Sequence, residues 1–170
     1  MIILLSGHAR AGKDTVADIL ERNYGAQVFA FADSIKDIAR KMGWDGKKDE
    51  KGRKLLQTLG TEVGRAYNEN VWVNMCIAEM KEARAAHNFT GFPKLFVVSD
   101  CRFPNEITRV KEEFPDVFTM RIHRDTEEHM GHSSETSLDD FTFDYHIDNN
   151  GTLEELEKAV DKIINNIGGR

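Results

Sequence analysis

Short apolar runs alternate with longer amphipathic stretches along the chain. Five of these runs are rich in branched or aromatic residues, which is typical of strands covered by helices on both faces; they are residues 2–5, 28–31, 95–98, 117–122 and 145–147. A helix that crosses over between two such strands makes the strands parallel. The pattern therefore predicts an α/β fold around a mostly parallel sheet, with ligands at the carboxyl ends of the strands.

Apolar residues at helical spacing predict helices between these strands. The stripes that precede residue 91 are Val16, Ile19 and Leu20; Ile35, Ile38, Ala39 and Met42; Leu55, Leu56, Leu59 and Val63; and Val73, Cys76, Ile77, Met80 and Ala83. A last helix begins with a capping box of Thr152 and Glu155. Residues 45–51 and 124–140 follow neither period, and we expect them to form loops over a site.

The composition excludes several classes of protein. A chain of 170 residues, 40% of them hydrophobic, is long enough to bury a core and fits one domain over residues 1–170. Its formal net charge of −6 and its lack of a basic run argue against a nucleic-acid duplex as partner. The two cysteines, Cys76 and Cys101, are typical of reduced thiols rather than of a disulfide framework.

The apolar N-terminal stretch, residues 1–5, has no basic flank and is too short for a signal peptide or a membrane span. We therefore expect a soluble, cytoplasmic protein that acts on small molecules and has no membrane partner. The sequence leaves the oligomeric state open, with a homodimer as one option.

The sequence GHARAGKDT, residues 7–15, has the spacing of a phosphate-binding P-loop. It lies between the first predicted strand and the first predicted helix, as this motif requires. Glycines in such a loop let backbone N–H groups point at phosphate oxygens, and the lysine neutralises the β- and γ-phosphates of ATP. A glycine-rich turn with an incidental lysine is the alternative, but it does not explain the flanking elements. The candidate residues of this ATP cradle are Gly7, Ala9, Arg10, Ala11, Gly12 and Lys13.

The residue after the lysine departs from the usual P-loop pattern. A Ser or Thr commonly binds Mg²⁺ there, but this chain has Asp14, with Thr15 one position later. Asp14 could hold magnesium through water, or Thr15 could take that role. Equally, Asp14 could simply favour the positive end of the helix. The residues alone leave these interpretations open.

A second acidic candidate ends the third predicted strand. Asp100 follows the run 95–98, at the position where P-loop proteins carry the aspartate that orients magnesium. The alternative is an aspartate that starts the following turn. Arg102 comes two residues later, at the expected carboxyl edge of the sheet, where its planar fork suits a substrate phosphate.

Further polar residues are candidates for the binding of a phosphate acceptor. Lys36, near the start of the second helix, could bind an acceptor phosphate. Asp33 could orient the attacking oxygen, but it is more readily explained as a helix cap. Arg53 and Gln57 lie one helical turn apart and face the same way. They could bind the base and the phosphate of an acceptor, or they could simply belong to a solvated helix face.

Two arginines surround the end of the fourth predicted strand. Arg124 begins the polar stretch 124–140 and is the candidate clamp of a lid over the site. Phosphoryl transfer needs positive charge on the migrating group and exclusion of water, because hydrolysis of ATP competes. Arg121 is the less favoured clamp, because its place in the strand is also explained by a surface residue without a role in the site.

Segments that span most of the chain resemble the deoxynucleoside monophosphate kinases of tailed bacteriophages; they are LLSGHARAGKDTVADIL, FADSIKDIA, LLQTLGTEVGR, VVSDCRFPNE, HSSETSLDD and DYHIDNNGTLEEL. The GKD variant also occurs in that family and in related phosphomevalonate kinases, so the resemblance implies that Asp14 is tolerated. It implies the P-loop NTPase fold of nucleoside monophosphate kinases, a three-layer sandwich around a parallel sheet built from about five strands. Acceptor-binding helices would lie within residues 33–90 and a lid within residues 124–140. For a phage-encoded chain the location would be the host cytoplasm.

The resemblance also implies transfer of the γ-phosphoryl group of ATP to a deoxynucleoside 5′-monophosphate, with Mg²⁺ as cofactor. The implied acceptor-binding residues are Asp33, Lys36, Arg53, Gln57 and Arg102, and the implied catalytic cations are Lys13, Arg102 and Arg124. The metal candidates are Asp14, Thr15 and Asp100. Asn149, Asn150 and Gly151 resemble the loop that borders adenine in such kinases, although a turn with a helix cap explains them at least as well.

Two other functions are candidates on the sequence alone. A kinase of another small phosphorylated metabolite, such as dephospho-coenzyme A or phosphomevalonate, would keep the P-loop and change the acceptor pocket. An ATP-binding regulatory module would need no second phosphate site, so the clustered arginines argue against it.

Overall fold

The computed structural model describes residues 1–90, 95–125 and 136–168. Within these ranges five strands form one sheet in the order β2-β3-β1-β4-β5; they are β1 (Ile2–Ser6), β2 (Gln27–Phe29), β3 (Phe96–Val98), β4 (Val117–His123) and β5 (Tyr145–Asp148). Every pair of neighbours is parallel. The central strand is β1, in which Leu4 pairs with Val98 on one side and with Thr119 on the other.

The helices are α1 (Lys13–Tyr24), α2 (Phe31–Lys41), α3 (Glu50–Gln57), the π-helix η1 (Thr58–Arg65), α4 (Val71–Thr90), α5 (Pro104–Glu113) and α7 (Leu153–Gly168). The apolar patterns predict all of these helices except α5. At the start of α7 the Thr152 N–H donates to Glu155 Oε2 at 2.7 Å, which confirms the capping box. No helix in the described part of the chain is long and apolar enough to cross a bilayer.

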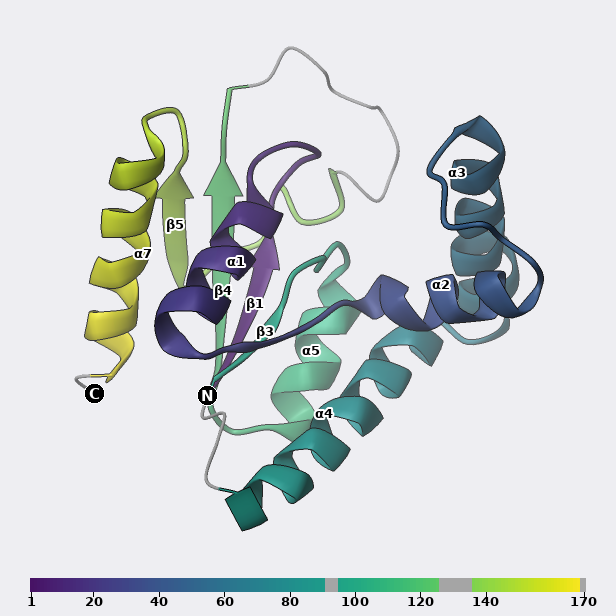
Figure 1. Cartoon of the computed structure of the whole chain (residues 1–170), viewed down its shortest axis with the longest axis horizontal. Coiled ribbons are helices and arrows are strands. Elements are labelled where there is room, and N and C mark those ends of the chain that lie inside the picture. Colours follow the sequence, from purple (N-terminus) through teal and green to yellow (C-terminus); the bar gives the residue numbers. More distant parts are fainter. Residues whose placement is uncertain (91–94, 126–135, 169–170) are drawn as a thin grey trace.

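The sheet separates two hydrophobic cores, because successive residues of a strand point to opposite faces. Ile3 and Leu5 of β1 face the core that α1 and α7 cover, whereas Ile2 and Leu4 face the core of α4 and α5. All strands point toward the edge that carries the loop between β1 and α1, and α2 and α3 extend away from the sheet (Figure 1). The predicted three-layer α/β fold is thus confirmed, with the carboxyl ends of its strands at one edge of the sheet.

One predicted strand is wrong at its carboxyl end. The run 28–31 ends early, because β2 stops at Phe29 and α2 begins at Phe31. The N–H groups of Phe31 and Ala32 donate to the carboxylate of Asp100 at 2.7 and 3.0 Å. This carboxylate satisfies backbone donors that the first turn of a helix leaves unpaired, so the helix can begin directly after the strand.

The expected loop over residues 45–51 is also shorter than the sequence predicts. Asp49 accepts a hydrogen bond from the Gly52 N–H at 2.8 Å and caps α3, which begins at Glu50. The charged residues that suggested a loop therefore include the first turn of a helix.

The third apolar stripe divides between α3 and η1, and the buried indole of Trp72 lies against η1. Its Nε1–H donates to the carbonyl of Gly60 at 2.8 Å. A β-carbon at Gly64 would lie 2.1 Å from the ring atom Cζ2 of Trp72. Small residues in η1 therefore make room for the tryptophan.

Replacing Gly64 with Ala should destabilise the protein by about 1–3 kcal/mol, because the added methyl group overlaps the indole and overpacks the core. Urea denaturation of the purified variant measures the change in the free energy of unfolding. Gly168→Ala is the matched control, since a β-carbon there meets nothing within 4 Å. Equal stability of Gly64→Ala and the wild type would contradict this packing.

Candidate active site

The loop between β1 and α1 curls closely against its surroundings. Gly12 has a φ of 101°, and a β-carbon there would lie 2.2 Å from Nδ2 of Asn149. A β-carbon at Gly7 would lie 2.5 Å from the carbonyl oxygen of Ile122 in β4. Both positions require glycine, because atoms of neighbouring elements occupy the space that a side chain would need.

Lys13, the first residue of α1, is folded back over this loop. Its Nζ donates to the carbonyl oxygens of Gly7 and His8 at 2.7 and 2.8 Å. The ammonium group therefore lies beside the loop and the N-terminus of α1, which carries partial positive charge. Together the cation and the helix end are suited to an anion such as a phosphate group.

Asn149, which follows β5, fixes the loop from a second side. Its side chain is buried, and its Nδ2 donates to the carbonyl oxygen of Ala11 at 2.8 Å. Asn150 is exposed, and its Oδ1 accepts a hydrogen bond from the Asp125 N–H at 2.8 Å. Sequence reasoning missed the support that Asn149 gives to the loop, although the turn after β5 drew attention to the segment. The role of Asn150 beside adenine stays a prediction.

The magnesium candidates Asp14 and Thr15 are exposed on the first turn of α1. Across residues 1–90, 95–125 and 136–168, no group of three or more His, Cys, Asp or Glu side chains could hold a metal ion. Mg²⁺ prefers oxygen ligands and commonly combines one or two carboxylates with water and substrate phosphates. The two side chains fit a magnesium ion that arrives with ATP, and the choice between them stays a prediction.

Asp100 ties the end of β3 to the start of α2. Both of its carboxylate oxygens accept backbone N–H groups, those of Phe31 and Ala32. Burial raises the pKa of Asp100, and these hydrogen bonds oppose that effect. The alternative that Asp100 merely starts a turn therefore leaves out its hydrogen bonds to the first turn of α2. Its contact with magnesium stays a prediction.

A buried carboxylate, Glu106 of α5, organises the segment after β3. Its Oε2 accepts the N–H groups of Arg102 and Phe103 at 2.7 and 2.9 Å. Its Oε1 accepts a hydrogen bond from Nη1 of Arg65 at 3.2 Å. The Arg65 guanidinium also stacks on the Phe103 ring, with Cζ 3.7 Å from the centroid. The backbone of Arg102 is thereby fixed to η1, a network that sequence reasoning missed.

Lys36 and Asp33 form an ion pair on α2, with Nζ 2.6 Å from Oδ1. The other carboxylate oxygen of Asp33 accepts the Ala30 N–H at 3.1 Å. This hydrogen bond confirms the interpretation of Asp33 as a helix cap. The contact of either side chain with an acceptor stays a prediction.

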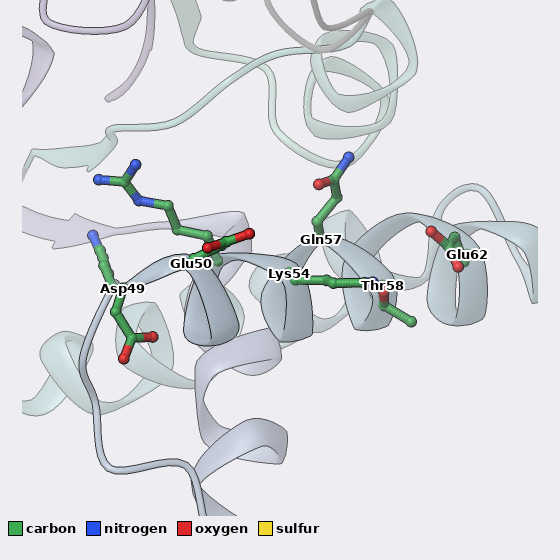
Figure 2. Close-up of a pocket in the computed structure, with 8 residues that line it drawn as sticks. Asp49, Glu50, Lys54, Gln57, Thr58 and Glu62 are labelled. Carbon is green, nitrogen blue, oxygen red and sulfur yellow. The ribbon is translucent and has the colours of Figure 1, made fainter.

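A hollow of about 560 Å³ lies along α3 and η1 (Figure 2). Arg53 and Gln57 both line it, as their helical spacing predicts. A guanidinium and an amide in one hollow can bind a phosphate and the hydrogen-bonding edge of a base. The full lining is Lys48, Asp49, Glu50, Arg53, Lys54, Gln57, Thr58 and Glu62.

The two arginines near the end of β4 differ in environment. Arg124 is exposed directly after the strand, and residues 126–135 of the predicted lid lie outside the described residues. The side chain of Arg121 is only 13% exposed, so its interpretation as a strand surface residue is wrong. Its Nη1 donates to Ser6 Oγ at 3.0 Å, and its Nη2 lies 3.2 Å from Nε2 of His8. The side chain thus turns toward the phosphate loop.

A parallel five-stranded sheet, with a glycine-bounded loop and a lysine between its central strand and the next helix, defines a P-loop kinase fold. Solved structures of shikimate kinases from Aquifex aeolicus vf5 and Bacteroides thetaiotaomicron are similar, with TM-scores of 0.54 and 0.58 at 14% identity. The alignments cover 99% of this chain and 97% and 98% of those chains. TT1252 from Thermus thermophilus has a TM-score of 0.53 at 19% identity, with 98% and 97% covered.

These similarities concern the fold alone, and the family is shown by the sequence. The sequence model for deoxynucleotide monophosphate kinase matches residues 1–52 and 44–160, so the chain belongs to that family. The protein is accordingly a phosphotransferase. No curated protein matches the sequence significantly.

Glu106 should make the stability of the protein depend on pH. Burial raises its pKa from 4.5 to about 7. Its stabilising contribution is therefore full below about pH 4.5 and is lost as the pH rises through about 7. Relative to Glu106→Gln, the free energy of unfolding of the wild type should fall by roughly 1–3 kcal/mol between pH 5 and pH 8. Urea denaturation at each pH measures this, and a constant difference across the range would contradict it.

Proposed function

We propose that this kinase transfers the γ-phosphoryl group of ATP to a deoxynucleoside 5′-monophosphate and releases the diphosphate. The observation that carries the proposal is the family match over residues 1–52 and 44–160. The phosphate loop supports it, because Lys13 lies over the loop carbonyls of Gly7 and His8. ATP is the donor in this proposal and Mg²⁺ its cofactor.

On the donor side, the loop from Gly7 to Gly12 would bind the phosphates of ATP through backbone N–H groups. Lys13 would neutralise the oxygens of the migrating phosphoryl group in the transition state. Bound Mg²⁺ would supply further positive charge on the same phosphates, with Asp14, Thr15 or Asp100 as its protein ligands.

On the acceptor side, the reaction needs alignment and positive charge more than a strong base, because the attacking oxygen belongs to an anionic phosphate. Arg102 follows β3 at the carboxyl edge of the sheet, and Glu106 fixes its backbone. Lys36, Arg53 and Gln57 would complete the acceptor site within residues 33–90. Arg124 would act from the lid. Residues 1–170 would form one functional unit.

A kinase of another small phosphorylated metabolite is the second candidate. The mixed charges of the hollow along α3 and η1 favour a polar acceptor without specifying a nucleobase. The identity of the acceptor therefore has to be determined by measuring which compound the protein phosphorylates.

Lys13→Ala should lower kcat at least about 100-fold, since the charge on the migrating phosphoryl group loses its main protein partner. Formation of ADP in a coupled assay measures the rate. Lys158→Ala, which removes an exposed cation from α7, is the control and should keep wild-type activity. Near-normal turnover by Lys13→Ala, with the protein folded, would exclude this role of the lysine.

An acceptor panel should identify at least one deoxynucleoside monophosphate that raises ATP consumption well above the rate without acceptor. The panel holds deoxy and ribo forms of each monophosphate, together with dephospho-coenzyme A and phosphomevalonate. A rise with one of the last two alone would favour the metabolite kinase. If no compound raised ATP consumption, a regulatory module would be favoured instead.

A further inference from the structure

Arg121 lies where the phosphate loop begins. It pairs in the sheet register with Ser6, the last residue of β1. Its Nη1 donates to the buried Ser6 Oγ at 3.0 Å, and its Nη2 lies 3.2 Å from Nε2 of His8. The guanidinium therefore holds the side chains on both sides of Gly7.

The same short segment supplies the hydrogen-bond acceptors of Lys13. The carbonyl oxygens of Gly7 and His8 accept from its Nζ at 2.7 and 2.8 Å. The His8 carbonyl oxygen also accepts the Ala11 N–H at 3.2 Å, which closes the turn of the loop. A shift of His8 would thus move both the loop and the lysine. Arg121 is linked to Lys13 through one residue.

Asp139 completes the cluster from a distant segment of the chain. Its Oδ1 forms an ion pair with Nη2 of Arg121 and lies 3.4 Å from Nε2 of His8. Leu138 and Phe143 of the same segment are buried in the core, and Cζ of Arg121 lies 5.6 Å from the centroid of the Phe143 ring. Core packing therefore fixes a carboxylate beside the phosphate loop.

A carboxylate at this position has an electrostatic consequence. Its negative charge would repel the phosphates of a nucleotide in the loop, and a nearby cation reduces that repulsion. Arg121 supplies the cation, with a side chain only 13% exposed, where screening by water is weaker than at the surface. The planar fork reaches Ser6 through Nη1 and both His8 and Asp139 through Nη2, whereas an ammonium group would have to make all such contacts from one nitrogen atom.

We propose that Arg121 is a positioning residue that sets the start of the phosphate loop, and through it Lys13, for ATP, with Asp139 as its counter-ion. Loss of Arg121 would act twice, by loosening the loop and by leaving the charge of Asp139 uncompensated. The inference rests on ATP as the donor in the proposed function, but not on the identity of the acceptor.

Calorimetric titration with a non-hydrolysable ATP analogue and Mg²⁺ tests this inference without an acceptor. Arg121→Met should weaken binding on the order of tenfold, and Arg121→Lys should restore only part of the loss. Asp139→Asn should bind at least as tightly as the wild type. The double variant Arg121→Met/Asp139→Asn should bind several-fold more tightly than Arg121→Met, because the uncompensated carboxylate is gone.

A matched ion pair provides the control. Arg22 and Glu157 join α1 to α7 with 2.5 Å between Nη2 and Oε1. Arg22→Met and Arg22→Met/Glu157→Gln make the same changes in charge, and both should bind the analogue with wild-type affinity. Thermal denaturation of every variant separates a loss of affinity from a loss of fold. In turnover assays of Arg121→Met, the KM for ATP should rise while the KM for the acceptor stays unchanged.

Wild-type affinity in Arg121→Met would overturn the inference, as would a double variant that binds no better than Arg121→Met. If Arg121→Met does not fold, Arg121→Lys decides, because wild-type affinity there would show that the fork is unnecessary. A wild type that does not bind the analogue would overturn both the donor assignment and this inference. A wild type that binds the analogue but phosphorylates no deoxynucleoside monophosphate would refute the acceptor assignment alone.

Discussion

The close approach of the phosphate loop to β4 and to Asn149 is the constraint on which the rest of the site depends. The backbone of Ile122 occupies the space that a side chain at Gly7 would need, and the side-chain amide of Asn149 occupies that space at Gly12. Because these neighbours come from β4 and from the turn after β5, the loop takes its shape only when the sheet is assembled. The N-terminal strand–loop–helix unit therefore depends on the C-terminal half of the chain.

Two carboxylates that follow β3 in the chain, Asp100 and Glu106 of α5, connect the centre of the fold to the outlying helices. Asp100 fixes the start of α2, and Glu106 fixes the turn of Arg102 and reaches Arg65 in η1. Burial raises the pKa of both carboxyl groups, so their negative charge is costly unless N–H donors surround it. The backbone supplies most of those donors, which couples α2, the turn after β3 and η1 to the sheet.

The strands and the phosphate loop could be predicted because their signals are local: apolar runs, and glycines at a fixed spacing before a lysine. The start of α2 could not, since it depends on Asp100, 69 residues after Phe31. The environment of Arg121 depends on His8, 113 residues away, so its position in a strand says little about its exposure. Likewise, the indole of Trp72 lies against Gly60 and Gly64 of η1, a contact that no periodicity encodes.

An acidic chain that binds anions must concentrate its positive charge at the site, because its net charge of −6 opposes them at long range. Lys36 and Arg121 both have carboxylate partners, Asp33 and Asp139. Lys36 carries a single ammonium group, so an acceptor phosphate bound there, as proposed, would compete with Asp33 for the same charge. The guanidinium of Arg121 has five N–H donors and can keep its protein contacts while its charge acts on a neighbouring phosphate. Arg121 can therefore hold the start of the phosphate loop and offset the charge of Asp139 at the same time.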